Sequence, residues 1–290
     1  MTEAAVQTDW RAWVGRERVL EDVMDVSRAR AMQATLNDSG APPEAAIQPG
    51  DALPPLWHWL YFWTATPWGS LGPDGHAARG GFLPPIALPR RMWAGSRLEF
   101  HRPLRLGAEA RCRSSIADIR FKAGRSGRLA FVTVRHEVTV AGTLCLSDEH
   151  DIVYREDPKP GAAPRPGEPA PAEAAWRREV RPDPVLLFRY SALTFNGHRI
   201  HYDQPYATGV EGYPGLVVHG PLLATFMVEL ARAHRPEASI ARFTFRALSP
   251  IFDTAPFAVA GRPSADGAGA DLWVANPRGE LAMRGRVDFA

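Results

Sequence analysis

A proline-rich segment near the middle of the chain limits its possible folds more than any other feature. Residues 157–175 read DPKPGAAPRPGEPAPAEAA, with six prolines among the first fifteen positions. Proline lacks a backbone N–H and fixes φ, so this composition is typical of an extended surface connector and excludes a helix or a central strand. We therefore predict two domains, residues 1–156 and 176–290, joined by a linker over residues 157–175.

The two halves have the same outline. In each, an apolar helix candidate precedes a run of strand candidates, and a repeat of this kind indicates a duplicated domain. The expected helices cover 56–66 and 220–233, and the expected strands cover 110–119, 129–140, 143–154, 257–261, 271–275 and 281–289. One long apolar helix followed by antiparallel strands, twice over, predicts an α+β fold with two antiparallel sheets, each wrapped around a central helix.

Composition excludes several classes of protein. The chain is 45% apolar, so disorder is not expected, and its net charge of +2 comes from interspersed charges that form no basic stripe for nucleic acid. Cys112 and Cys145 lack the spacing of a disulfide framework or a structural zinc site. The longest uncharged stretch, 52–73, is interrupted by Pro54, Pro55 and Pro67 and leaves no helix long enough to span a membrane. The N-terminus has no signal-peptide pattern, and we predict a cytoplasmic protein.

Chemistry-bearing side chains concentrate in residues 188–220. This segment contains three histidines, one asparagine, one aspartate and five glycines, and it leads into the helix expected at 220–233. Glycines allow tight turns and close approach of a ligand to the backbone, and loops carry many binding and catalytic residues. A functional site on a loop against a helix N-terminus is therefore predicted here.

Two motifs in this segment resemble those of the MaoC-like, (R)-specific enoyl-thioester hydratases and dehydratases. They read NGHRIHYD, from Asn196 to Asp203, and GLVVHG, from Gly215 to Gly220. The resemblance extends across nearly the whole chain and implies a double hot-dog fold, as in the branch that includes hydroxyacyl-thioester dehydratases and the hydratases of mesaconyl-C4-CoA and itaconyl-CoA. It also implies an acyl-CoA substrate, with no cofactor beyond the coenzyme A of that substrate and no metal.

The resemblance assigns roles to three residues. His201 falls on the catalytic histidine, Asn196 on the family's catalytic aspartate, and the Gly220 backbone N–H on the group that binds the thioester oxygen. An amide, unlike a carboxylate, cannot take a proton from water, so Asn196 would orient water and His201 would carry both proton transfers. The further candidates for substrate binding are His219, Arg199, Tyr202 and Gly215.

These residues also have alternative interpretations. Asn196 precedes a glycine, and Asn-Gly is a favoured turn pair. His198 and His201, with Asp203 nearby, have a spacing that permits a metal, and His219 could be a packing histidine that fixes the loop. The first half has no matching motif, so it is expected to form the wall of a substrate tunnel and to lack catalytic residues.

The predicted reaction is reversible addition of water across the double bond of an enoyl-CoA, with mesaconyl-C4-CoA (3-methylfumaryl-CoA) or itaconyl-CoA giving citramalyl-CoA. The alternatives are a (3R)-hydroxyacyl-thioester dehydratase of fatty-acid synthesis, an acyl-CoA thioesterase and a non-catalytic acyl-thioester binding protein. A dicarboxylate needs a buried cation, for which Arg91, Arg97 and Arg199 are candidates, whereas a long acyl chain needs an apolar tunnel. Two fused halves already supply the pair that single hot dogs form by dimerisation, so a monomer and a homodimer both remain open.

Overall fold

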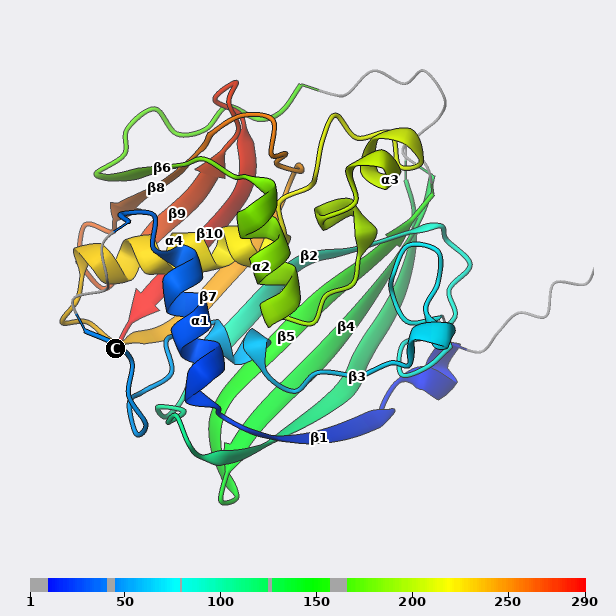
Figure 1. The fold of residues 1–290 in the computed structure, drawn as a ribbon, viewed down its shortest axis with the longest axis horizontal. Coiled ribbons are helices and arrows are strands. Elements are labelled where there is room, and N and C mark those ends of the chain that lie inside the picture. Colours follow the sequence, from blue (N-terminus) through cyan, green and yellow to red (C-terminus); the bar gives the residue numbers. More distant parts are fainter. Residues whose placement is uncertain (1–9, 41–44, 79, 125–126, 157–165) are drawn as a thin grey trace, which may run out of the picture.

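A ten-stranded sheet forms the frame of the protein (Figure 1). The computed structural model describes residues 10–40, 45–78, 80–124, 127–156 and 166–290. Within them the strand order is β1-β3-β4-β5-β2-β7-β10-β9-β8-β6, and every neighbouring pair is antiparallel. The first five strands therefore form one half of the sheet and the last five form the other.

The predicted strands and the helix expected at 220–233 are present, with ends shifted by a few residues. The strands are β1 (Glu17–Val23), β2 (Arg90–Phe100), β3 (Glu109–Gly124), β4 (Gly127–Val140), β5 (Thr143–Arg155), β6 (Trp176–Val180), β7 (Ile240–Ala247), β8 (Phe257–Pro263), β9 (Gly269–Ala275) and β10 (Leu281–Phe289). The α-helices are α1 (Val26–Leu36), α2 (Pro184–Leu193), α3 (Gln204–Gly209) and α4 (Gly220–His234). Of these, β1, β2, β6, β7 and the first three helices lie outside the ranges expected from the sequence.

Helix α4 is the buried centre of the second half. Leu222, Phe226, Met227 and Leu230 recur at helical spacing and are all buried, so the helix packs its apolar face on β8, β9 and β10. Pro221 lies in its first turn, where a backbone N–H would have no hydrogen-bond partner within the helix, so its absence costs nothing. The helix crosses the strands of this half in Figure 1, as expected for a sheet wrapped around a central helix.

The prediction of a helix at 56–66 in the first half was wrong. Only a 3₁₀ turn, Trp57–Leu60, forms there, because the flanking residues Leu56 and Phe62 have positive φ values of 72° and 60°. The helix of this half is α1, whose polar sequence hides it from a search for apolar stripes. Its start is set by Asp25, whose side chain accepts hydrogen bonds from the first-turn backbone N–H groups.

A buried carboxylate fixes the 3₁₀ turn on the sheet. Asp148 of β5 is 1% exposed, and its Oδ2 accepts a hydrogen bond from Trp59 Nε1 at 2.9 Å. The same oxygen lies 3.3 Å from His58 Nε2 and 2.6 Å from His150 Nε2. Burial raises the pKa of this carboxyl group, but the two histidines more than offset the effect and keep it well below its usual value. An ionised, buried aspartate thus holds the segment in place of helical hydrogen bonds.

The two predicted sheets join edge to edge through β2 and β7. Their register runs from Gly95 opposite Arg246 to Glu99 opposite Arg242. At Gly95 an added Cβ would lie 2.3 Å from the Phe245 carbonyl oxygen, so glycine permits the close approach of these strands. This pairing fixes the position of the first half relative to the second.

The described part of the predicted linker is extended. Residues 157–165 lie outside the described residues, whereas 166–175 run beside the start of β10, with Pro169 bridged to Glu280. The Leu281 N–H donates to the Glu168 carbonyl at 2.7 Å. The limits proposed for the two domains stay a prediction.

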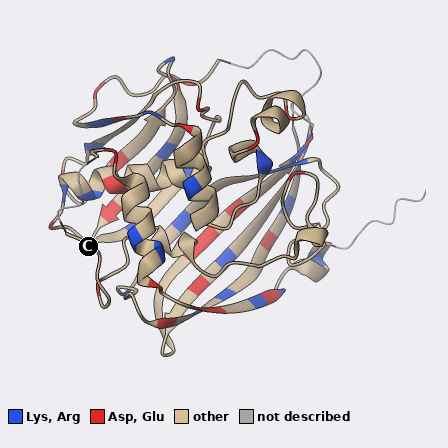
Figure 2. Cartoon of the chain, in the orientation of Figure 1, with Lys and Arg blue, Asp and Glu red and all other residues tan. Residues whose placement is uncertain are grey.

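Acidic and basic residues are interspersed along the strands of the first half (Figure 2). Many pair across neighbouring strands; examples are Arg97 with Glu149 and Asp151, and Arg113 with Glu17 and Glu137. Both cysteines are free and buried. None of the helices in the described ranges is long and apolar enough to cross a bilayer.

Replacing Gly95 by alanine should destabilise the joint between the halves. The added methyl group meets the Phe245 carbonyl oxygen, and overpacking of this kind costs about 1–3 kcal/mol. Urea unfolding followed by circular dichroism should show the lower free energy of unfolding. Gly209→Ala is the matched control, because a methyl group there meets no atom within 4 Å; equal effects of the two substitutions would contradict the interpretation.

Candidate active site

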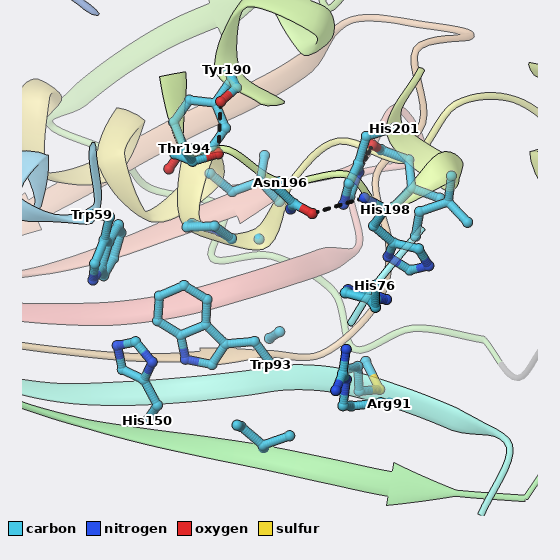
Figure 3. Close-up of a pocket in the computed structure, with 18 of the residues that line it drawn as sticks. Trp59, His76, Arg91, Trp93, His150, Tyr190, Thr194, Asn196, His198 and His201 are labelled. Carbon is cyan, nitrogen blue, oxygen red and sulfur yellow. Dashed lines mark hydrogen bonds between the residues drawn. The ribbon is translucent and has the colours of Figure 1, made fainter. Parts of the chain in front are cut away.

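A cavity of about 1000 Å³ lies where the two halves meet. Figure 3 shows Asn196 and His201 from the second half on one side of it, and Arg91, Trp93 and His150 from β2 and β5 on the other. Ligand pockets measure roughly 300–1,000 Å³. The cavity is therefore large enough for an acyl group together with part of its carrier.

The turn that ends α2 presents Asn196 to the cavity. Phe195 has a positive φ of 50°, and its exposed ring stacks on Trp63 of the first half with 5.2 Å between ring centroids. The Asn196 N–H donates to the Ser191 carbonyl at 2.8 Å, and its Oδ1 accepts a hydrogen bond from the His198 N–H at 3.0 Å. Because Oδ1 is engaged, Nδ2 is the group that can donate to a ligand in the cavity.

His201 is a buried imidazole with one free nitrogen. It lies in the 3₁₀ turn Arg199–His201 and is 7% exposed. Its Nδ1 is 2.7 Å from the Val217 carbonyl oxygen, which places a proton on Nδ1 and leaves Nε2 as the basic nitrogen. Burial lowers the pKa of His201 to about 4, although the Val217 carbonyl opposes the shift. The ring is therefore neutral at physiological pH, as a general base must be.

The buried ring of His219 stacks on the ring of His201. It is 0% exposed, its ring stacks on that of His201 at 3.7 Å, and its Nε2 lies 2.8 Å from Ser191 Oγ. It is absent from the cavity wall, so the predicted substrate contact is replaced by the packing role that was its alternative.

Gly220 places a backbone N–H at the cavity. It is the first residue of the 15-residue helix α4 and lines the cavity, and no atom lies within 4 Å of the position that a Cβ would take. Helix N-termini carry partial positive charge, and Pro221 contributes no N–H of its own. The Gly220 N–H is thus open to an oxygen atom that becomes negative.

Arg199 holds the loop together instead of lining the cavity. Its Nη2 lies 2.7 Å from Asp203 Oδ2, and its Nη1 donates to the Pro73 carbonyl at 3.0 Å. The carboxylate of Asp203 also accepts a hydrogen bond from the Tyr206 N–H at the start of α3. These contacts favour a structural role for Arg199, and substrate binding by this residue stays a prediction.

Tyr202 and Gly215 also lie away from the cavity that His201 lines. Tyr202 is 45% exposed, donates to the Gly197 carbonyl at 3.0 Å and borders an adjoining hollow of about 950 Å³. Gly215 packs against Asp253, where a Cβ would lie 2.5 Å from Oδ1. A side chain at position 215 would therefore collide with Asp253, which accounts for a glycine there, and contact of Gly215 with substrate stays a prediction.

A loop of the first half docks onto the loop that carries Asn196. At Gly75, with a φ of 87°, a Cβ would lie 1.9 Å from the Gly197 carbonyl oxygen, so the two backbones touch. The Arg199 N–H also donates to the Asp74 carbonyl at 2.9 Å. This docking brings His76 into the cavity wall, a residue that no sequence motif indicated.

His76 is oriented by Asp74. Asp74 Oδ2 lies 2.9 Å from His76 Nδ1, and Oδ1 accepts a hydrogen bond from the His76 N–H at 3.0 Å. Burial raises the pKa of Asp74, but the hydrogen bonds and charge of His76 lower it below its usual value. The His76 and His198 rings lie 4.1 Å apart, and the ligand atoms of Asp74, His76 and His198 lie within 4.8 Å of one another, close enough to hold a metal ion. Asp74 and His76 are instead bonded directly to each other, and the absence of a metal stays a prediction.

The three arginines proposed for a substrate carboxylate have different environments. Arg97 is half-exposed and paired with Glu149 and Asp151, away from the cavity. Arg91 lines the cavity and, like Arg18 of β1, has no carboxylate partner among the described residues. The Nε of Arg18 is buried without a hydrogen-bond partner.

Two relatives and a family model match most of the chain. Residues 56–253 match the model described as hydroxyacyl-thioester dehydratase type 2. The chain is 51% identical over 281 residues to the mesaconyl-C(4)-CoA hydratase of Chloroflexus aurantiacus, covering 97% of this chain and 98% of that protein. It is 30% identical over 269 residues to the mitochondrial hydroxyacyl-thioester dehydratase type 2 of Schizosaccharomyces pombe, covering 83% of this chain and 88% of that protein.

Solved structures show the same fold at low sequence identity. HtdX of Mycobacterium tuberculosis has a TM-score of 0.66 and 16% identity, covering 94% of this chain and 98% of that one. A MaoC-like dehydratase from Phytophthora capsici has a TM-score of 0.66 and 13% identity, covering 95% and 96%. A further M. tuberculosis protein, described as having a double hot-dog fold, has a TM-score of 0.57 and 14% identity, covering 95% and 96%. The predicted double hot-dog fold is confirmed.

His201 should stay uncharged until the solution is strongly acidic. Its burial disfavours the imidazolium, so NMR titration of ¹⁵N-labelled histidine should place its midpoint near pH 4, below the ordinary value of about 6.5. The His201→Gln variant identifies the resonance by its loss. A midpoint at the ordinary histidine value would contradict the buried, neutral state described here.

Proposed function

Because the chain belongs to the hydroxyacyl-thioester dehydratase type 2 family, we propose that it is a hydro-lyase that adds water reversibly across the double bond of an enoyl-CoA. The observation that carries this proposal is the meeting of Asn196, His201 and Gly220 at one cavity. They supply an amide donor, a neutral imidazole and an open backbone N–H, which are the groups that this reaction needs.

The reaction proceeds as follows in this proposal. Nε2 of His201 takes a proton from water while the water oxygen bonds to Cβ, and the electrons of the double bond move toward the thioester. The Gly220 N–H stabilises the negative charge on the thioester oxygen, aided by the helix dipole of α4. His201 then returns a proton to Cα, and dehydration is the reverse sequence.

Asn196 holds the water in this scheme by donating from Nδ2 to its oxygen. This assignment is supported by the hydrogen bond that its Oδ1 already accepts from the His198 N–H. An asparagine donor needs no change of charge during the reaction, so the base must be His201 alone.

We propose mesaconyl-C4-CoA as the substrate, with citramalyl-CoA as the product. Support comes from the C. aurantiacus relative, whose name states this activity, and from the polar part of the cavity wall. That wall includes Arg18, Arg91 and the pair formed by Ser114 and His136, whose Oγ and Nδ1 are 2.8 Å apart. A long apolar chain would offer no hydrogen-bond acceptor to the two guanidinium groups, and an unsatisfied buried donor costs about 1–3 kcal/mol.

Parallel assays with mesaconyl-C4-CoA and crotonyl-CoA test the substrate. We expect faster loss of the enoyl-thioester absorbance with mesaconyl-C4-CoA. Preference for crotonyl-CoA or longer chains would instead favour a dehydratase of fatty-acid synthesis, the activity named for the S. pombe relative. Release of free coenzyme A, measured with a thiol reagent, would identify a thioesterase.

Replacing His201 by alanine should remove the base. General acid–base catalysis contributes about 10²–10⁴-fold, so kcat should fall by that factor while KM changes little. The exposed residue His101, which lies outside the cavity, gives the control variant His101→Ala. A His201→Ala protein that is folded by circular dichroism and hydrates at the parent rate would overturn the mechanism.

A further inference from the structure

We propose that Arg91 and His76, both from the first half, bind the free carboxylate of the substrate. This inference rests on the proposed function and identifies the residues that select a dicarboxylyl thioester. In mesaconyl-C4-CoA the free carboxylate is attached to Cβ, the carbon that receives the water. Its binding site must therefore lie beside the groups that activate water, within the length of a carbon–carbon bond and one hydrogen bond.

Arg91 is the first candidate for this role. It lies on β2, lines both the cavity and the adjoining hollow, and has no carboxylate partner among the described residues. Figure 3 shows Arg91 beside His76, on the side of the cavity that faces Asn196 and His201. A half-buried guanidinium at the cavity wall, with no hydrogen-bond or ion-pair partner among the described residues, is suited to a planar carboxylate.

His76 supplies a second donor at the same place. Asp74 accepts a hydrogen bond from Nδ1 of His76, and the ring lines the cavity with Arg91. When both ring nitrogens carry protons, Nε2 donates to the carboxylate of the substrate. The contact of Gly75 with Gly197 and the bond from Arg199 N–H to Asp74 hold this histidine against the second half. The residue is thus fixed in place before substrate arrives, which reduces the entropy lost on binding.

The same residues lie next to the base. The rings of His76 and His198 are 4.1 Å apart, and those of His198 and His201 are 5.4 Å apart. Burial lowers the pKa of His198, and the charges of His76 and Arg91 lower it further. Arg18 is a less suitable partner, because the groups it acts on are His136 and Cys112, on β4 and β3.

The Arg91→Met variant separates recognition of the carboxylate from catalysis. We expect kcat/KM for mesaconyl-C4-CoA to fall about 100-fold or more, since a buried carboxylate loses its charged partner. Crotonyl-CoA has a methyl group at the position of the carboxylate and a hydrogen in place of the Cβ methyl group. For this substrate kcat/KM should stay within about threefold or rise, because no unpaired cation remains. Arg91→Lys keeps the charge without the planar fork and should lie between parent and Arg91→Met.

Arg97→Met is the matched control. It removes an arginine from the same strand, but one that faces Glu149 and Asp151 outside the cavity, so both substrates should be turned over as by the parent. His76→Phe keeps a ring but removes the second donor, and it should reduce kcat/KM for mesaconyl-C4-CoA about tenfold, again sparing crotonyl-CoA. Thermal melting confirms that each variant is folded.

Binding of saturated thioesters gives a readout without turnover. Succinyl-CoA and butyryl-CoA differ by a carboxylate in place of a methyl group at the position of interest. Their inhibition constants as competitive inhibitors can be compared. In the parent and in Arg97→Met, succinyl-CoA should bind more tightly than butyryl-CoA. In Arg91→Met the two should bind equally well.

The two possible failures are distinguishable. If the parent protein hydrates crotonyl-CoA but not mesaconyl-C4-CoA, the proposed substrate is wrong. If the parent prefers mesaconyl-C4-CoA and Arg91→Met lowers kcat/KM for both substrates equally, or keeps the preference for succinyl-CoA, the proposed function stands and the carboxylate site is overturned.

Discussion

The pairing of β2 with β7 is the constraint on which the rest of the structure depends. It turns two five-stranded halves into one sheet, and it places Arg91 and Trp93 of β2 in the same cavity as His201 and Gly220. Gly95 allows this joint because a side chain there would meet the backbone of β7. The docking of Gly75 on Gly197 is a second backbone contact between the halves, so their relative position is fixed at two separated points.

Within this frame the histidines are kept neutral by burial and by one another. His198, His201 and His219 form a file of adjacent rings, and burial is the main cause that lowers the pKa of each. Each ring also disfavours a second positive charge nearby. His76 differs because Asp74 provides a carboxylate partner. The arrangement separates an uncharged base on one wall from the guanidinium of Arg91 on the facing wall.

The sequence alone predicts those features that depend on residues close together in the chain. The motifs around Asn196, His201 and Gly220, the strands of each half and helix α4 follow from short-range patterns. The helix expected at 56–66 was wrong because an aromatic-rich run reads as a buried helix, whereas contacts to the distant Asp148 hold it as a turn. His76 was missed, and Arg91 could not be ranked above Arg97 and Arg199, because these residues reach the site only through strand pairing and loop docking far along the chain.

The origin of these groups in different halves has an evolutionary consequence. The groups suited to moving protons come from residues 196–220, and those facing the substrate's far end come from residues 74–93. Mutations in the earlier part of the gene can therefore alter which acyl groups are accepted while the later part keeps its reaction chemistry. A fused pair of once-equivalent units gains this freedom, whereas a symmetric homodimer must change both copies together.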